Sequence, residues 1–157
     1  MKITAIFSGM AIVLLVNCSS FQEVQSNVND VSLNELPEST NTITEKYWKL
    51  IELKGQKVTI SPGQEKEAHF VLHTEASKLA GYSGCNAFFG EYTLSEGNRI
   101  RFENLASTMR ACPDLNVSEQ ELFQVFGMVD NYTIHNDTLQ LNIGRRAPLA
   151  VFNAVYF

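Results

Sequence analysis

Hydrophobic and polar positions divide the chain into three parts. An apolar run at residues 3–16 follows Lys2, residues 19–44 are mostly Ser, Asn, Glu, Gln and Thr, and short apolar segments recur from about residue 45 onward. A basic start with an apolar run too short to span a bilayer is typical of a secretory signal peptide. The polar part has no persistent period, which predicts a flexible tether. The third part is the predicted folded domain.

Short alternating segments in this third part predict β-strands, since alternation places every second side chain on the same face. Clusters of turn-forming residues, such as Ser61-Pro62-Gly63 and Ser95 to Asn98, separate the segments. The predicted strands cover residues 47–53, 58–60, 68–73, 78–82, 88–94, 99–104, 132–134, 139–141 and 149–157.

One segment has a helical pattern instead. Ser118 followed by Glu121 is a capping box, which satisfies free amides at the start of a helix. A 3.6-residue period then places four apolar side chains on one stripe: Leu122, Val125, Phe126 and Val129. We therefore predict a helix at about residues 118–130. Many strands with a single principal helix predict an α+β domain, a small, mostly antiparallel curved β-sheet or open barrel.

The end of the apolar run carries a more specific signal. Leu15-Val16-Asn17-Cys18 resembles the lipobox of bacterial lipoproteins, although Asn17 stands where Gly, Ala or Ser is usual. The resemblance implies a signal peptide at residues 1–17, acyl chains such as palmitate on Cys18, and a tether that extends to residue 44. Several acyl chains, at about 0.8 kcal/mol per buried methylene, give stable anchoring. In a Gram-negative host, Ser19 implies an outer-membrane lipoprotein that faces the periplasm.

The charge of the chain argues against an anionic partner. The chain has 12 basic and 17 acidic residues, and loss of Lys2 with the leader would change its formal charge from −5 to −6. Such a balance argues against nucleic acid or an anionic membrane surface as the main partner. No basic patch is evident along the sequence, and the pair Arg145-Arg146 is interpreted as a solvated turn. We therefore expect the lipid alone to provide the anchor.

Two cysteines remain after Cys18. In an exported protein an even pair, here Cys85 and Cys112, predicts a disulfide. The bond would close a loop of about 28 residues and contribute about 3–4 kcal/mol to stability.

Two segments together indicate a family. The first is Gly-Tyr-Ser-Gly-Cys-Asn-Ala-Phe-Phe-Gly-Glu-Tyr at residues 81–92, and the second is Ala-Ser-Thr-Met-Arg-Ala-Cys-Pro at residues 106–113, followed by Glu121-Leu122. With Trp48-x-Leu50 they resemble the META/HslJ domain family over about residues 45–157. The resemblance implies a small antiparallel β domain with a helix, in envelope or heat-shock-associated lipoproteins. Some members are linked to antibiotic tolerance or motility, and no enzymatic activity or cofactor is implied.

The motif residues allow a structural and a functional interpretation. Glycine tolerates positive φ, and Asn86 can form an Asx turn, so residues 81–90 predict a sharp connection stapled by the disulfide. The alternative is a binding rim on the two motif loops, because loops on rigid scaffolds often carry function. The candidate rim residues are Gly84, Asn86, Thr108, Met109 and Arg110.

Other chemistries have weaker support. Thiolate and thioether ligands suit Cu(I), so a copper module using Cys85, Cys112 and Met109 is the alternative function. His69 and His73 would lie about 13 Å apart on a strand, too far to share a metal, and are predicted to be solvated. No phosphate-binding loop and no nucleophile motif is present. We therefore expect a non-enzymatic envelope lipoprotein without cofactor or metal, which binds an envelope protein or acts in envelope stress or antibiotic tolerance.

Overall fold

The computed structural model describes residues 42–62, 64–112 and 115–157. The predicted signal peptide, Cys18 and nearly all of the predicted tether lie outside the described residues. The described elements, in chain order, are β1 (Tyr47–Leu53), β2 (Gln56–Lys57), β3 (His69–His73), η1 (Glu75–Ser77), β4 (Lys78–Tyr82), β5 (Ala87–Ser95), β6 (Arg99–Ser107), α1 (Glu119–Met128), β7 (Asn131–His135), β8 (Thr138–Asn142) and β9 (Ala150–Val155).

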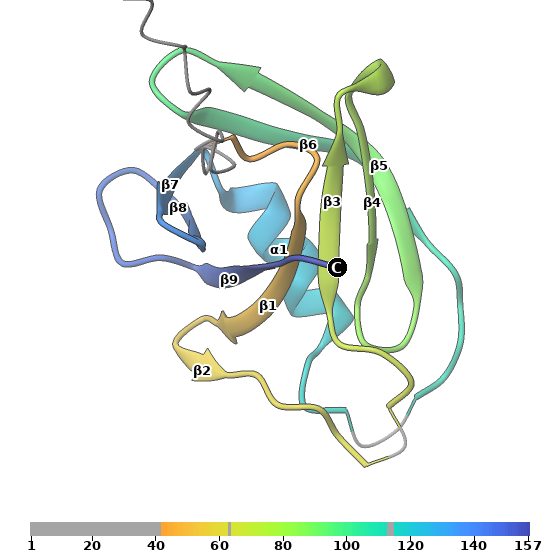
Figure 1. The fold of residues 1–157 in the computed structure, drawn as a ribbon. Coiled ribbons are helices and arrows are strands. Elements are labelled where there is room, and N and C mark those ends of the chain that lie inside the picture. Colours follow the sequence, from red (N-terminus) through yellow and green to blue (C-terminus); the bar gives the residue numbers. More distant parts are fainter. Residues whose placement is uncertain (1–41, 63, 113–114) are drawn as a thin grey trace, which may run out of the picture. The chain divides into compact units, whose positions relative to one another are not determined.

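The strands form one curved antiparallel sheet (Figure 1). Within the described residues it has nine strands in the order β2-β1-β3-β4-β5-β6-β7-β8-β9, and β1 pairs with β9 as well. The β1–β9 pairing runs from Tyr47 to Leu53, whereas β6 and β7 pair only at Arg99 and Asn131. Because that junction is so short, the curved sheet is not a closed barrel. The predicted α+β class, with one principal helix on a curved sheet, is confirmed.

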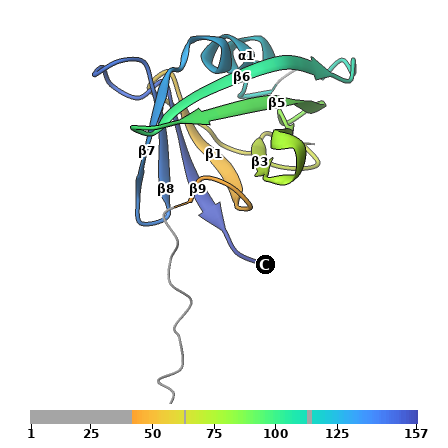
Figure 2. The ribbon, with the colours of Figure 1, turned by 90° about the horizontal axis from the view of Figure 1, so that it is seen from above.

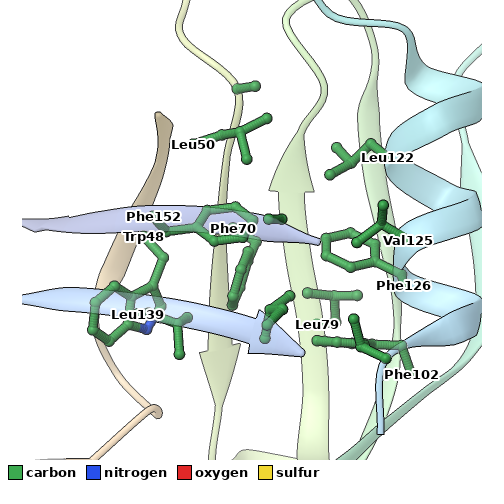
Figure 3. Close-up of a cluster of buried hydrophobic side chains, with 14 of the residues drawn as sticks. Trp48, Leu50, Phe70, Leu79, Phe102, Leu122, Val125, Phe126, Leu139 and Phe152 are labelled. Atoms are coloured by element: carbon green, nitrogen blue, oxygen red, sulfur yellow. The ribbon is translucent and has the colours of Figure 1, made fainter. Parts of the chain in front are cut away.

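Strand alternation builds the hydrophobic core. Trp48 and Leu50 alternate along β1, and Phe70 and Leu72 alternate along β3, so each pair points to the inner face. Phe70 packs edge-on against Phe152 and Phe126, with ring centroids 4.8 and 5.9 Å apart (Figure 3). The Trp48 indole is completely buried and donates its N–H to the Ile43 carbonyl, at 2.7 Å. The chain just before β1 therefore belongs to the core.

Helix α1 lies within the curve of the sheet (Figures 1 and 2). Its buried side chains are Leu122, Val125 and Phe126, three of the four predicted from the helical period. The Ser118 hydroxyl caps the Glu121 amide at 3.3 Å, while the Glu121 carboxylate approaches Lys54 at 3.6 Å. The helix ends at Met128, earlier than predicted, because Val129 adopts an extended conformation. Among the described residues no helix is sufficiently long and apolar to span a bilayer.

The predicted strand at residues 58–60 is wrong. Lys54 and Gly55 both have positive φ, which turns the chain so tightly that Gln56 pairs with Leu53, and β2 ends at Lys57. Beyond it the Thr59 amide is satisfied by the Asn116 side chain, at 3.0 Å, instead of by a strand. The short 3₁₀ turn η1 was not predicted, and its left-handed residues Ala76 and Ser77 carry no glycine signal.

Candidate functional site

The two motif segments meet at the disulfide predicted from the sequence. Cys85 and Cys112 are bonded, with their Cα atoms 5.9 Å apart. Cys85 lies in the short connection between β4 and β5, and Cys112 follows the end of β6. The bond therefore joins a tight turn to the chain that leaves the adjacent strand.

The β4–β5 connection is sharply folded by its own hydrogen bonds. The Ser83 amide donates to the Asn86 carbonyl at 2.8 Å, and the Asn86 amide donates to the Ser83 hydroxyl at 3.0 Å. Gly84 has a φ of +99°, and a Cβ at this position would lie 3.1 Å from the Gln64 side chain. Gly81 lies beneath the Phe88 ring, where a Cβ would approach a ring carbon to 2.2 Å. Both positions therefore require glycine.

Asn86 connects this turn to the second motif segment. Its side chain is buried, and its Oδ1 accepts hydrogen bonds from the Arg110 amide at 2.7 Å and the Thr108 hydroxyl at 3.0 Å. Its Nδ2 donates to the Arg110 carbonyl at 3.2 Å. The Thr108 amide also donates to the Ala87 carbonyl at 3.0 Å. One buried amide side chain thus holds the Thr108 side chain and the Arg110 backbone, which lie on either side of Met109.

Glu119 ties both segments to the helix. As the first residue of α1 it accepts the Ser83 hydroxyl at 2.7 Å and the Ser107 hydroxyl at 3.0 Å. A carboxylate in the first turn of a helix is favourable, because free amides there carry partial positive charge. Sequence analysis missed Glu119, although an acidic residue directly after a helix cap is a general signal for this position.

Arg110 directs its side chain towards Glu65 and lines a cleft of about 200 Å³ together with Gly84. Its guanidinium forms two contacts with the Glu65 carboxylate, at 3.3 and 3.4 Å. This pairing raises the pKa of Arg110 and lowers the pKa of Glu65. Both side chains are exposed, so the pair contributes little to stability. Sequence analysis also missed Glu65, which is 45 residues away along the chain.

Met109 stands out at the surface of this region. It is 99% exposed, although the Thr108 backbone before it is held by Ala87 and the Arg110 backbone after it is held by Asn86. Beside it lies a shallow cleft of about 660 Å³, lined in part by Ala106 and Glu119. A second cleft of about 460 Å³ is lined by the disulfide and the start of α1. On the neighbouring strand, Phe89 pairs with Ala106 and is 57% exposed.

The arrangement offers surface and shape rather than an evident reactive group. The hydroxyls of Ser83 and Ser107 both donate to Glu119. Both sulfur atoms of Cys85 and Cys112 are in the disulfide, so a Cu(I) site would require reduction first. Across residues 42–157, apart from the three that the structure leaves undescribed, no group of three His, Cys, Asp or Glu is placed to hold a metal.

His69 is partly buried, whereas the sequence predicted a solvated side chain. Its ring stacks on Tyr47 with centroids 4.2 Å apart, and Tyr82 lies on β4 at 6.2 Å. Burial lowers the pKa of His69, although its Nδ1 contacts the Glu67 carbonyl at 2.9 Å. Burial also raises the pKa of Tyr47 to about 12, with Glu67 adding to the shift. These residues form an aromatic row on neighbouring strands, and Tyr82, at one end of the row, lines a cleft with Gly84 and Arg110.

Comparison with known proteins identifies the family. The model of the META domain matches residues 41–156, nearly the whole described part of the chain. The chain belongs to the META domain family. A similar fold is found in a Burkholderia xenovorans protein solved by NMR, with a TM-score of 0.58, 21% identity, and coverage of 72% of this chain and 83% of that one.

A second NMR structure has a TM-score of 0.55 at 20% identity and covers 71% of this chain and 90% of its own. At these identities the two structures support the META fold alone. No curated protein matches the chain.

In this META domain the predicted rim residues come together in part. The backbone around Gly84 and Asn86 lies against Thr108 to Arg110, while the Met109 side chain projects outward and the Arg110 side chain turns towards Glu65. We call the five residues Gly84, Asn86, Thr108, Met109 and Arg110 the motif rim. The lipidation site Cys18 lies outside the described residues.

Proposed function

We propose that this META domain protein is a non-enzymatic, lipid-anchored protein of the cell envelope that binds another envelope protein through the motif rim. The observation that carries the proposal is the contrast at Met109. Its side chain is 99% exposed, yet the residues on either side of it are fixed by the buried Asn86.

A fixed backbone favours binding because less conformational entropy is lost when a partner docks. Methionine suits such a contact, since its flexible thioether side chain adapts to irregular apolar surfaces. Ala106 and the half-exposed Phe89 extend the apolar area next to Met109. Polar groups surround this area, as is usual where proteins meet. The rim therefore combines an apolar centre with a defined shape.

The anchor is the second part of the proposal and rests on the sequence. Lipid on Cys18 would hold the domain at the membrane, with 23 residues between Cys18 and Thr42 as the connection. A role in envelope stress or antibiotic tolerance would then arise from partner binding at the motif rim, because the lipid holds the protein at the envelope.

Site-specific crosslinking tests the binding rim. A photoreactive amino acid replaces Met109 in the full chain, and cells are irradiated intact. Met128, on the exposed side of α1 and 42% exposed, is the matched control position. We expect a discrete protein adduct from position 109 and none from position 128. Equal adduct patterns at both positions, or no adduct at 109 in correctly folded protein, would refute the rim.

Metabolic labelling tests the anchor separately. Cells that express the full chain are fed labelled palmitate, with Cys18→Ser as the variant and Cys112→Ser as the control. Incorporation into the parent and the control, and its loss in Cys18→Ser, is the expected result. Unlabelled protein in all three cases would refute the lipid anchor. The crosslinking experiment would still test the motif rim on its own.

A further inference from the structure

Folding brings four of the five arginines of this acidic chain to one end of the domain. Arg99 and Arg101 begin β6, and Arg145 and Arg146 lie in the loop between β8 and β9. In Figures 1 and 2 the β5–β6 turn and the β8–β9 loop lie on the same side of the domain. We call Arg99, Arg101, Arg145 and Arg146 the arginine face.

Asp130 joins the two halves of this face. Its carboxylate accepts the Gly144 amide at 2.9 Å and lies 3.4 Å from the Arg99 guanidinium. Asn131 makes a second contact with the β8–β9 loop, because its Nδ2 donates to the Gly144 carbonyl at 2.9 Å. The loop that carries Arg145 and Arg146 is therefore fixed directly beside the start of β6.

The other three guanidinium groups have no anionic partner in the part of the chain that the structure describes. Among the residues that the structure describes, no carboxylate lies within ion-pair distance of Arg101, Arg145 or Arg146, and all three are exposed. Asp130 is already engaged by Arg99, Asn131 and Gly144. Glu96 and Glu103 flank the β6 arginines along the chain without pairing with them. Within the described residues the face thus carries positive charge that no carboxylate neutralises, although the acidic balance of the whole sequence argued against an anionic membrane as the main partner.

We propose that the arginine face binds the phosphate groups of an anionic membrane surface. A guanidinium is planar and offers paired donors that match phosphate oxygens. The four groups are spread over a strand and a loop, and the hollow between Arg99 and Arg101, with Thr93 and Ser95, measures only about 160 Å³. A spread of exposed donors suits a surface of many headgroups, whereas a single free phosphate needs a buried cradle.

The position of the face relative to the motif rim supports this assignment. Strand β5 begins beside the rim at Ala87 and ends at Ser95, which pairs with Arg99 at the arginine face. At about 3.3 Å per residue, the β5–β6 ribbon separates the two surfaces by roughly 25 Å. With the arginine face against headgroups, the motif rim would point away from the bilayer, towards a partner. This orientation rests on the proposed function, whereas phosphate binding by the arginines does not.

Vesicle binding tests the proposal on the full chain. Partition onto vesicles of phosphatidylcholine with phosphatidylglycerol is compared with partition onto phosphatidylcholine alone, so that the apolar N-terminal run contributes equally to both. The variant carries Arg101→Gln, Arg145→Gln and Arg146→Gln. The control removes the same charge elsewhere, with Lys49→Gln, Lys57→Gln and Lys66→Gln. Thermal melting confirms that both variants fold.

The arginine variant should lose roughly tenfold to a hundredfold of its preference for anionic vesicles, since each basic residue near such a surface contributes measurably. The lysine variant should lose less than about threefold by the same reasoning. Equal losses in both variants, or no preference of the parent for anionic vesicles, would overturn the proposal. So would release by inorganic phosphate beyond that by chloride at matched ionic strength, because that result would indicate a free-phosphate site. None of these outcomes depends on crosslinking at Met109.

Discussion

The two ends of the β5–β6 ribbon are held in opposite ways. At the motif rim, one buried side chain, Asn86, makes three hydrogen bonds across the two segments, and a disulfide adds a covalent link. At the arginine face, β6 and β7 share a single residue pair, and the contacts of Asp130 are exposed. The first end presents a fixed apolar shape and the second presents exposed positive charge. Shape selects a particular partner, whereas charge attracts a class of surfaces.

Removal of the disulfide at the motif rim should cause the largest loss of stability. The double variant Cys85→Ser/Cys112→Ser is expected to lose about 3–4 kcal/mol of unfolding free energy, because the open chain gains loop entropy. Urea unfolding under non-reducing conditions measures the difference. Cys18→Ser, which leaves the pair intact, is the control. An unchanged midpoint would show that the bond adds no stability.

Removal of the Asn86 side chain should cause the second largest loss of unfolding free energy. Asn86→Ala leaves the Arg110 amide and carbonyl and the Thr108 hydroxyl without partners, which should cost about 2–3 kcal/mol. Asn153→Ala is the matched control, because its one side-chain hydrogen bond, to Thr138, is exposed. Its cost should remain below about 0.5 kcal/mol. If the two variants unfold alike, the motif turn does not depend on Asn86.

At the arginine face the expected effect is local. Asp130→Ala removes the acceptor of the Gly144 amide, so this amide should exchange its hydrogen faster while the Arg110 amide is unaffected. Hydrogen exchange followed by NMR measures both amides in one sample. Glu96→Ala, in the β5–β6 turn, is the control. Accelerated exchange at both ends would mean that the two regions open together.

The smallest expected effect on stability comes from His69, which lies on β3 and not on the β5–β6 ribbon. Burial lowers the pKa of His69 below its ordinary value of 6.5, so the unfolded chain binds a proton more readily than the folded domain. Stability should therefore fall as pH decreases through 6.5 towards the folded pKa. His69→Gln should flatten this dependence. Melting temperatures across this pH range measure it, and the same pH dependence in the variant as in the parent would contradict the prediction.

Most of the fold could be predicted from local patterns. Alternation gave the inner faces of β1 and β3, and Ser118 marked the start of α1, because these signals lie within a few residues. The strand predicted at 58–60 was wrong because Lys54 and Gly55 form a tight turn, so that β2 begins at Gln56 and ends at Lys57. Turn η1 has no sequence signal, since its left-handed residues are Ala76 and Ser77 and not glycine.

The site was less predictable because its contacts are long-range. The family motifs indicated which segments meet, and paired cysteines indicated the bond. The partners Glu119 and Glu65 come from a helix and a loop that no local pattern connects to the motifs. Likewise, Arg101 and Arg145 are 44 positions apart, so their common face arises only from the folded sheet.

Backbone order at the motif rim shows whether Asn86 and the disulfide fix the chain segment that displays Met109. We predict ¹⁵N order parameters at Thr108, Met109 and Arg110 close to about 0.85, the value of a rigid backbone, and a clear drop in Asn86→Ala. Values below about 0.6 in the oxidised parent protein would contradict the account, because a flexible loop would then carry Met109.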